Sequence, residues 1–169
     1  MDYQYQPERE PQKENREQAL RKAKLKALKL LECMDRTESQ LREKLLNAEF
    51  DPGIVEQAIA YVKSFGYIDD ERYVRNYIES RCRQKSRRQI MQELQFRKGV
   101  SAELIQQVYE ELEPSDEKEL IRSQLRKKHY SPDTCDEKQR QKLIAALLRK
   151  GFHMGDILAV LREAPEEWQ

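Results

Sequence analysis

The sequence predicts an all-α protein built from three tandem three-helix repeats that form an elongated, curved array. Apolar residues recur at spacings of three and four, as in Leu20, Ala23, Ala27 and Leu31, and Gly and Pro fall almost only between such segments. Helix-capping patterns return at intervals of 49 and 48 residues. No stretch combines sustained alternation of apolar and polar residues with enrichment in β-branched residues.

The repeat is visible at both ends of its middle helix. Capping boxes, in which a hydroxyl accepts one backbone N–H while a Glu or Gln side chain accepts another, fit Thr37–Gln40, Ser86–Gln89 and Thr134–Glu137. The helices that follow close near Phe50, Val100 and Phe152, two of them after Gly99 and Gly151 as left-handed C-caps. The positions five, eight and nine residues after Phe50, Val100 and Phe152 are apolar in all three repeats and form one helical face. These residues are Val55, Ala58, Ile59, Ile105, Val108, Tyr109, Ile157, Val160 and Leu161.

From these anchors the elements follow in order. Helices are expected over 17–33, 38–49 and 52–64, then 70–83, 87–98 and 102–112, then 116–128, 136–149 and 154–163. Asp51 followed by Pro52, and Ser101, are good starts for the third helices of two repeats. The domains are predicted as a flexible arm over 1–16, repeats over 17–66, 67–113 and 114–164, and a tail over 165–169.

Charge is segregated along the chain although its formal net value is only +1. Residues 19–31 carry five basic and no acidic groups, residues 72–98 nine and two, and residues 122–151 nine and three. Residues 32–71 and 101–121 are acidic, with four basic against ten acidic groups and one against seven. The near-zero sum therefore does not exclude nucleic acid as a partner.

The densest basic cluster lies across the first two helices of the middle repeat. It consists of Arg81, Arg83, Lys85, Arg87, Arg88, Arg97 and Lys98. Guanidinium groups suit phosphate or carboxylate recognition, and the first amides of a helix starting near Ser86 would face the same anion. A solvated helical face is the alternative. Tyr73 and Tyr77 could stack on bases, but their neighbours Val74 and Ile78 favour core packing.

The sequence shows no group of residues that is typical of an enzyme active site. The five glycines form no phosphate-binding loop, and two histidines with three widely spaced cysteines (Cys33, Cys82 and Cys135) favour neither a catalytic nor a metal site. No cofactor is expected, and the cysteines are expected to be buried or half-buried. The longest apolar run, Leu143–Leu148, is too short to span a membrane, and residues 1–16 do not resemble a signal peptide. We therefore expect a cytoplasmic protein without membrane contact.

The segment Gly66-Tyr-Ile-Asp-Asp-Glu-Arg-Tyr73 resembles the hallmark of the RecX family of bacterial regulatory proteins at every position. Ser39–Leu45 and Arg87–Leu94 are similar to two further family regions, so that the resemblance covers about residues 26–163. The sequence departs from the family pattern in a shortened turn at Gln84–Ser86 and in one extra residue between Leu94 and Gly99. Both departures lie beside the basic cluster.

The resemblance implies a non-enzymatic regulator that binds RecA and its filament on single-stranded DNA and modulates its recombinase and ATPase activity, with inhibition favoured over assistance. A monomer is expected. Double-stranded DNA is a further candidate ligand. Two alternative functions remain open: a DNA-binding protein of helix-turn-helix type that acts without RecA, and a scaffold for another protein. The hallmark residues Gly66, Tyr67, Asp69, Asp70, Arg72 and Tyr73 are predicted to be mainly structural: a left-handed C-cap, a packed junction with Ile68, and carboxylates that cap the next helix. Arg72 is expected to pair with one of those carboxylates.

Overall fold

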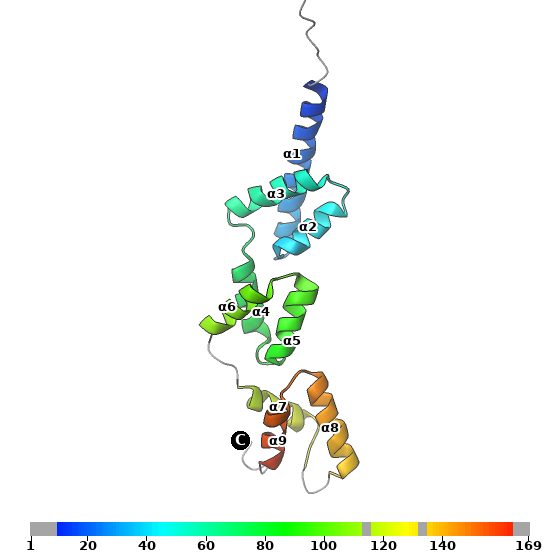
Figure 1. Ribbon diagram of the computed structural model, residues 1–169, viewed down its shortest axis with the longest axis vertical. Helices are drawn as coiled ribbons and strands as arrows, with labels where there is room; N and C mark the ends of the chain where they lie inside the picture. The colour runs from blue at the N-terminus through cyan, green and yellow to red at the C-terminus, as the bar shows by residue number, and fades with distance from the viewer. Residues whose placement is uncertain (1–9, 113–115, 132–134, 164–169) are drawn as a thin grey trace, which may run out of the picture. The chain divides into compact units, whose positions relative to one another are not determined.

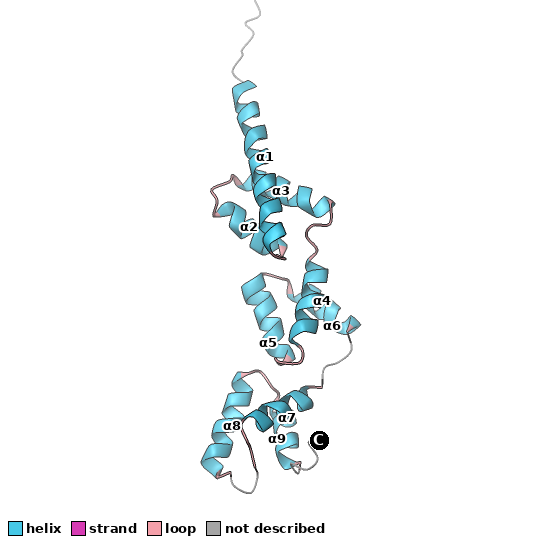
Figure 2. Ribbon diagram, turned by 180° about the vertical axis from the view of Figure 1, so that it is seen from behind, coloured by secondary structure: helices cyan, strands magenta, loops and turns pink. Residues whose placement is uncertain are grey.

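The computed structural model describes residues 10–112, 116–131 and 135–163, and every regular element in these ranges is helical (Figure 2). The elements are α1 (Glu10–Cys33), α2 (Glu38–Leu46), α3 (Pro52–Ser64), α4 (Asp70–Arg81), α5 (Arg87–Gln92), the π-helix η2 (Glu93–Arg97), α6 (Ala102–Glu111), α7 (Glu117–Lys127), α8 (Glu137–Arg149) and α9 (Met154–Arg162) (Figure 1). The predicted all-α class is confirmed. None of the described helices has the length and apolar character to cross a membrane.

The chain divides into two compact units. The first runs to Tyr73 and includes Lys98–Val100; the second holds Val74–Arg97 and the chain from Ser101 onwards. In the first unit α1 packs mainly on α3. The small buried residues Ala23 and Ala27 of α1 allow the helices to approach closely around the core. In the second unit Val74 and Ile78 of α4 and Ile105 and Val108 of α6 are buried as predicted, whereas Tyr109 is half-buried. Helices α7, α8 and α9 enclose a further cluster around Ile121, Leu125 and Ile157.

The predicted caps are present in most places. Thr37 forms the complete capping box with Gln40, Ser86 accepts the N–H of Gln89, and Asp51 and Ser101 cap α3 and α6. Gly66, Gly99 and Gly151 all have positive φ, as their predicted role as left-handed C-caps requires.

The predicted start of α1 and the predicted cap of α8 are wrong, and α2 and α4 end at Leu46 and Arg81, earlier than the predicted residues 49 and 83. Residues 10–16 of the expected flexible arm belong to α1, because Glu, Gln, Lys and Arg are good helix formers that need no burial to continue a helix. The capping box at the start of α8 uses Asp136 and Gln139, two positions later than expected, while Thr134 lies outside the described residues. The domain boundaries stay a prediction.

A buried hydroxyl cap makes the same contacts in both units. In the first unit Thr37 Oγ1 accepts the N–H of Gln40 and donates to the carbonyl oxygen of Lys98, 2.5 Å away. In the second, Ser86 Oγ accepts the N–H of Gln89 and donates to the carbonyl oxygen of Lys150 at 2.6 Å. Both carbonyls precede a left-handed glycine, so the cap of a middle helix is bonded to the C-cap of the next one along the chain.

An acidic residue completes each of these joints. The backbone N–H of Glu38, the first residue of α2, donates to Asp70 Oδ1 at 2.9 Å. The equivalent N–H of Arg87 in α5 donates to Glu117 Oε1 at 2.7 Å. Asp70 and Glu117 are the first residues of α4 and α7, so each joint satisfies an amide that the helix itself leaves free.

Two side chains differ from their expected surroundings. Ile68 is buried as predicted, but Tyr67 is 54% exposed and lies beside the exposed ring of Phe65, with the centroids 6.2 Å apart. Cys33 is exposed, contrary to the expectation that it would be buried or half-buried, whereas Cys82 and Cys135 are half-buried.

Candidate nucleic-acid interface

The hallmark residues take part in helix capping. Asp69 caps α4 by accepting the N–H of Arg72 at 2.9 Å, and Asp70 accepts the N–H of Glu38 from α2. Burial raises the pKa of the Asp70 carboxyl, although the hydrogen bond from Glu38 opposes the rise. The side chain of Arg72 is exposed, and within the described residues no ion pair joins it to Asp69 or Asp70, so the expected pairing is wrong.

Two of the first amides of α5 are already bonded within the chain. Ser86 occupies the N–H of Gln89, and the carboxylate of Glu117 occupies that of Arg87. A carboxylate at a helix N-terminus is stabilised by the helix dipole, as a bound anion would be. The amides of Arg87 and Gln89 therefore do not face an external anion, contrary to the expectation, because Glu117 and Ser86 accept their hydrogen bonds.

Lys85 belongs to an internal network rather than to the open surface. Its ammonium lies 2.6 Å from both carboxylate oxygens of Glu93, which also accepts a hydrogen bond from the Tyr77 hydroxyl at 2.7 Å. Burial by itself would raise the pKa of Glu93, but the hydrogen bonds from Lys85 and Tyr77 outweigh burial and hold that pKa below its ordinary value. The hydroxyl of the half-buried Tyr77 is thus bonded within the fold.

The arginines of the cluster fall into two groups. Arg81 and Arg87 lie over aromatic rings, with their guanidinium carbons 5.2 Å from the centroid of Tyr77 and 4.4 Å from that of Tyr109. Arg83, Arg88 and Arg97 are exposed. Lys98 lies in the first unit, where its carbonyl is bonded to Thr37, and does not join this group.

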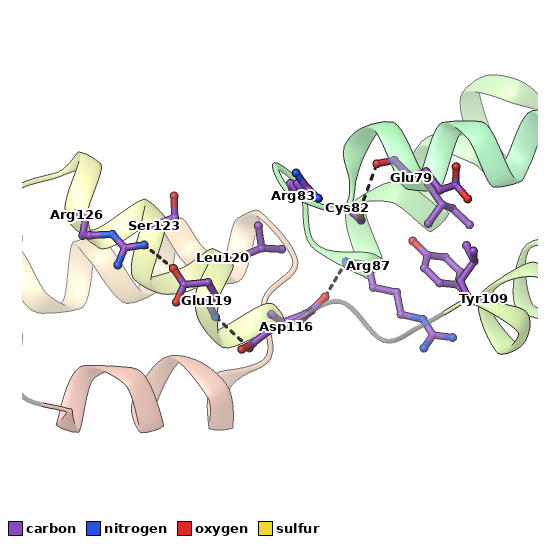
Figure 3. A pocket seen from close by; sticks show the side chains of 13 residues that line it. Glu79, Cys82, Arg83, Arg87, Tyr109, Asp116, Glu119, Leu120, Ser123 and Arg126 are labelled. Carbon is purple, nitrogen blue, oxygen red and sulfur yellow. Dashed lines mark hydrogen bonds and ion pairs between the residues drawn. The ribbon is translucent and has the colours of Figure 1, made fainter. Parts of the chain in front are cut away.

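Arg83 and Arg87 line a groove of about 950 Å³ in the second unit (Figure 3). Arg126 of α7, which the sequence did not single out, also lines it, paired with Glu119. The remaining lining side chains are of mixed character: Ile78, Glu79, Cys82, Tyr109, Leu112, Asp116, Glu117, Glu119, Leu120 and Ser123. A groove with both charges and apolar walls suits a protein segment better than a bare phosphate chain.

The outer surface of α5 and η2 has a different composition. From Gln84 to Lys98 the single acidic residue is Glu93, which is 9% exposed and neutralised by Lys85. The exposed positions of the two helices are Arg87, Arg88, Gln92, Gln95, Phe96 and Arg97. We call these six residues the α5–η2 surface. Its guanidinium, amide and aromatic groups are those that contact phosphates and bases in nucleic-acid complexes.

Helical three-helix domains in tandem, joined by repeated polar contacts, define a helical-repeat protein of the kind that binds other macromolecules through exposed helix faces. Family models for the first, second and third three-helix domains of RecX match residues 23–61, 69–108 and 116–161. The chain belongs to the RecX family, whose members are named regulatory proteins.

Individual relatives agree with this assignment. The regulatory protein RecX of Corynebacterium efficiens is 31% identical over 163 residues, which cover 90% of this chain and 77% of the relative. The protein of the same name from Clostridium perfringens strain 13 is 31% identical over 134 residues, 78% of this chain and 63% of that protein, so this chain spans less than two thirds of that relative.

Solved structures show the same fold. A crystal structure of a regulatory protein RecX superposes with a TM-score of 0.78 at 22% identity, over 96% of this chain and 81% of that one. The crystal structure of RecX from Lactobacillus salivarius gives a TM-score of 0.70 at 18% identity, over 86% of this chain and 96% of the other. The predicted family resemblance and the predicted three-helix domains are therefore confirmed.

Proposed function

We propose that this protein binds RecA and its filament on single-stranded DNA and inhibits the recombinase and ATPase activity of RecA. Membership of a family of regulators supports the role. The observation that carries the proposal is the presence, in one unit, of two surfaces of different chemistry: the α5–η2 surface without an exposed acid, and the mixed-charge groove beside it at Arg87. A nucleoprotein filament, which presents both protein and nucleic acid, is complementary to these two surfaces.

In this proposal each of the two surfaces binds a different component of the filament. Arg88 and Arg97 of the α5–η2 surface contact phosphates, and the groove, which Arg83 lines, accepts a segment of RecA. The protein acts in the cytoplasm, as a monomer, without a catalytic step of its own.

The test is a titration of the full chain into RecA on single-stranded DNA, with ATP hydrolysis as the readout. Hydrolysis should fall as the protein approaches a stoichiometric ratio, and Arg83→Ala combined with Arg97→Ala should require several-fold more protein for the same effect. Lys118→Ala is the matched control, since Lys118 is an exposed cation in the acidic segment 101–121. Unchanged hydrolysis at a stoichiometric ratio would refute the proposal.

A DNA-binding protein that acts without RecA is the second candidate, and the acid-free α5–η2 surface is the observation that favours it. Its affinity for DNA would fall with salt at a log–log slope of about −0.7 to −0.9 per phosphate contacted. Salt-dependent binding to DNA together with no effect on RecA would select this candidate over the first.

A further inference from the structure

The C-terminal end of the middle helix has one residue more in the second repeat than in the first and third. In the first and third repeats the closing aromatic follows the last buried leucine by five positions, from Leu45 to Phe50 and from Leu147 to Phe152. There the N–H of the closing residue donates to the carbonyl of that leucine, at 3.4 and 3.3 Å. In the second repeat six positions separate Leu94 from Val100.

The extra residue is absorbed by a π-turn. The helix changes from α to π at Glu93–Arg97, which widens its turn by one residue while Leu94 and Val100 both stay buried. Single π-turns of this kind occur frequently at functional sites. The position of the π-turn within the basic cluster therefore suggests a use beyond packing.

Phe96 is the side chain that this turn exposes. Four residues before the closing position the three repeats have Leu46, Phe96 and Leu148, exposed by 42%, 77% and 37%. Phe96 has the largest exposed fraction among the exposed large apolar side chains of the described residues. An aromatic ring held this far out of the core gains nothing from burial.

The neighbours of Phe96 indicate what would cover it. Gln92, Gln95 and Arg97 are exposed on the same helical turn and a half, and the nearest acid in the sequence, Glu93, is buried and paired with Lys85. A protein anchor would be expected within an apolar patch, which these polar neighbours do not provide. A single ring among amides and guanidinium groups instead suits an unpaired base, with the phosphates on the arginines.

We propose that Phe96 is a base-stacking residue for single-stranded nucleic acid, with Arg97 and the two glutamines beside it contacting the backbone and base edges. This inference rests on the nucleic-acid part of the proposed function and assigns a residue to it. The π-turn presents the ring, and the acid-free α5–η2 surface attracts the strand. Stacking of one base on an aromatic side chain is worth about 1–3 kcal/mol, or roughly five- to 150-fold in affinity.

The experiment measures binding of the full chain to a labelled single-stranded oligonucleotide by fluorescence anisotropy, without RecA and at fixed salt. Phe96→Ala should weaken binding at least five-fold, Phe96→Trp should retain it, and Phe96→Leu should lose nearly as much as the alanine variant. Leu148→Ala is the matched control, because it occupies the same register in the third repeat, and it should leave affinity unchanged. Circular dichroism checks that each variant is folded.

A stacking role has two further signatures. An oligonucleotide that carries a fluorescent base analogue should be quenched by the wild type and by Phe96→Trp but not by Phe96→Leu. Duplex DNA, whose bases are already stacked, should bind equally to the wild type and to Phe96→Ala. Wild-type affinity in Phe96→Ala or Phe96→Leu, or no binding of the oligonucleotide by the wild type, would overturn the inference.

The RecA titration separates this inference from the proposed function. If the wild type leaves ATP hydrolysis unchanged while oligonucleotide binding still requires Phe96, the proposed function fails and the stacking role stands. If the wild type inhibits RecA and Phe96→Ala binds the oligonucleotide normally, the stacking role fails and the function stands. Loss of RecA inhibition in Phe96→Ala with unchanged oligonucleotide binding would assign Phe96 to a protein contact and refute base stacking.

Discussion

Replacement of Gly99 by Ala should destabilise the protein far more than replacement of Gly66, although both glycines have nearly the same backbone conformation. Their φ angles are 66° and 69°, in the left-handed region that favours glycine. A Cβ atom on Gly66 would meet nothing within 4 Å, whereas one on Gly99 would lie 2.6 Å from Cβ of Ser39 and closer still to its hydroxyl. Gly66→Ala therefore measures the conformational cost alone.

The expected magnitudes follow from this geometry. A left-handed alanine costs about 1–2 kcal/mol, of which roughly 0.4–1 kcal/mol is recovered because alanine restricts the unfolded chain, so Gly66→Ala should cost about 1 kcal/mol. Gly99→Ala adds a forced displacement of α2 at Ser39, about 1–3 kcal/mol for overpacking. The displacement also strains the bond from Thr37 to the carbonyl of Lys98, worth about 1 kcal/mol. The total should be about 2–5 kcal/mol, and the upper end applies if the Thr37 bond is lost.

Urea unfolding followed by far-UV circular dichroism measures both changes on the full chain. Ser39→Gly removes the two atoms that a Cβ at Gly99 would strike, so in that background Gly99→Ala should cost only as much as Gly66→Ala. Equal destabilisation by Gly66→Ala and Gly99→Ala, within about 0.5 kcal/mol, would show that the joint is not close-packed and would refute the reasoning.

Three other changes test the second unit. Glu93→Gln should lower the free energy of unfolding by about 1–3 kcal/mol at neutral pH because it leaves the Lys85 ammonium without a carboxylate. The pKa of Glu93 is held below its ordinary value in the folded protein. The Glu93 carboxylate therefore contributes its full stabilisation at a pH above the ordinary pKa and loses it as the pH falls through the lowered pKa. Acid titration between about pH 5 and 3 should destabilise the wild type more than Glu93→Gln. Ser86→Ala should cost about 1–3 kcal/mol in urea unfolding, since it removes both the cap of α5 and the bond to the Lys150 carbonyl, while Ser86→Thr should cost less. Tyr109→Phe should leave the unfolding midpoint unchanged or raise it slightly, because the buried Tyr109 hydroxyl has no hydrogen-bond partner among the described groups.

Local chemistry explains why most of the fold could be predicted from the sequence. Apolar periodicity and glycine C-caps involve residues within a few positions of one another, and they located all three left-handed glycines. The start of α8 could not be decided in this way, because Thr134 and Asp136 are both good caps followed three residues later by Glu137 and Gln139. The start of α1 was missed because residues 10–16 are polar helix formers with no apolar pattern.

The candidate site was less predictable because its partners are distant in the sequence. Counting charges found the basic cluster, but it could not show that Lys85 is neutralised by Glu93 or that Glu117, thirty residues away, occupies the N–H of Arg87. The groove also depends on Arg126 from the next repeat. One signal was present for Phe96: the extra residue between Leu94 and Gly99, which marks the π-turn once the three repeats are aligned.

The repeated joints explain why function should be sought on the outer faces of the middle helices. Both joints use a hydroxyl cap, a carboxylate and the carbonyl that precedes a left-handed glycine. These groups come from Thr37, Asp70 and Lys98 in one joint and from Ser86, Glu117 and Lys150 in the other. Polar groups used in this way cannot also bind a partner, so the groups that bind must be those that differ between equivalent helices. The α2 helix carries Glu38 and Glu43, whereas α5 and η2 expose no acid and gain an exposed phenylalanine through one extra residue. The nucleic-acid contact that we propose therefore lies on the middle repeat, where the common architecture differs at these positions.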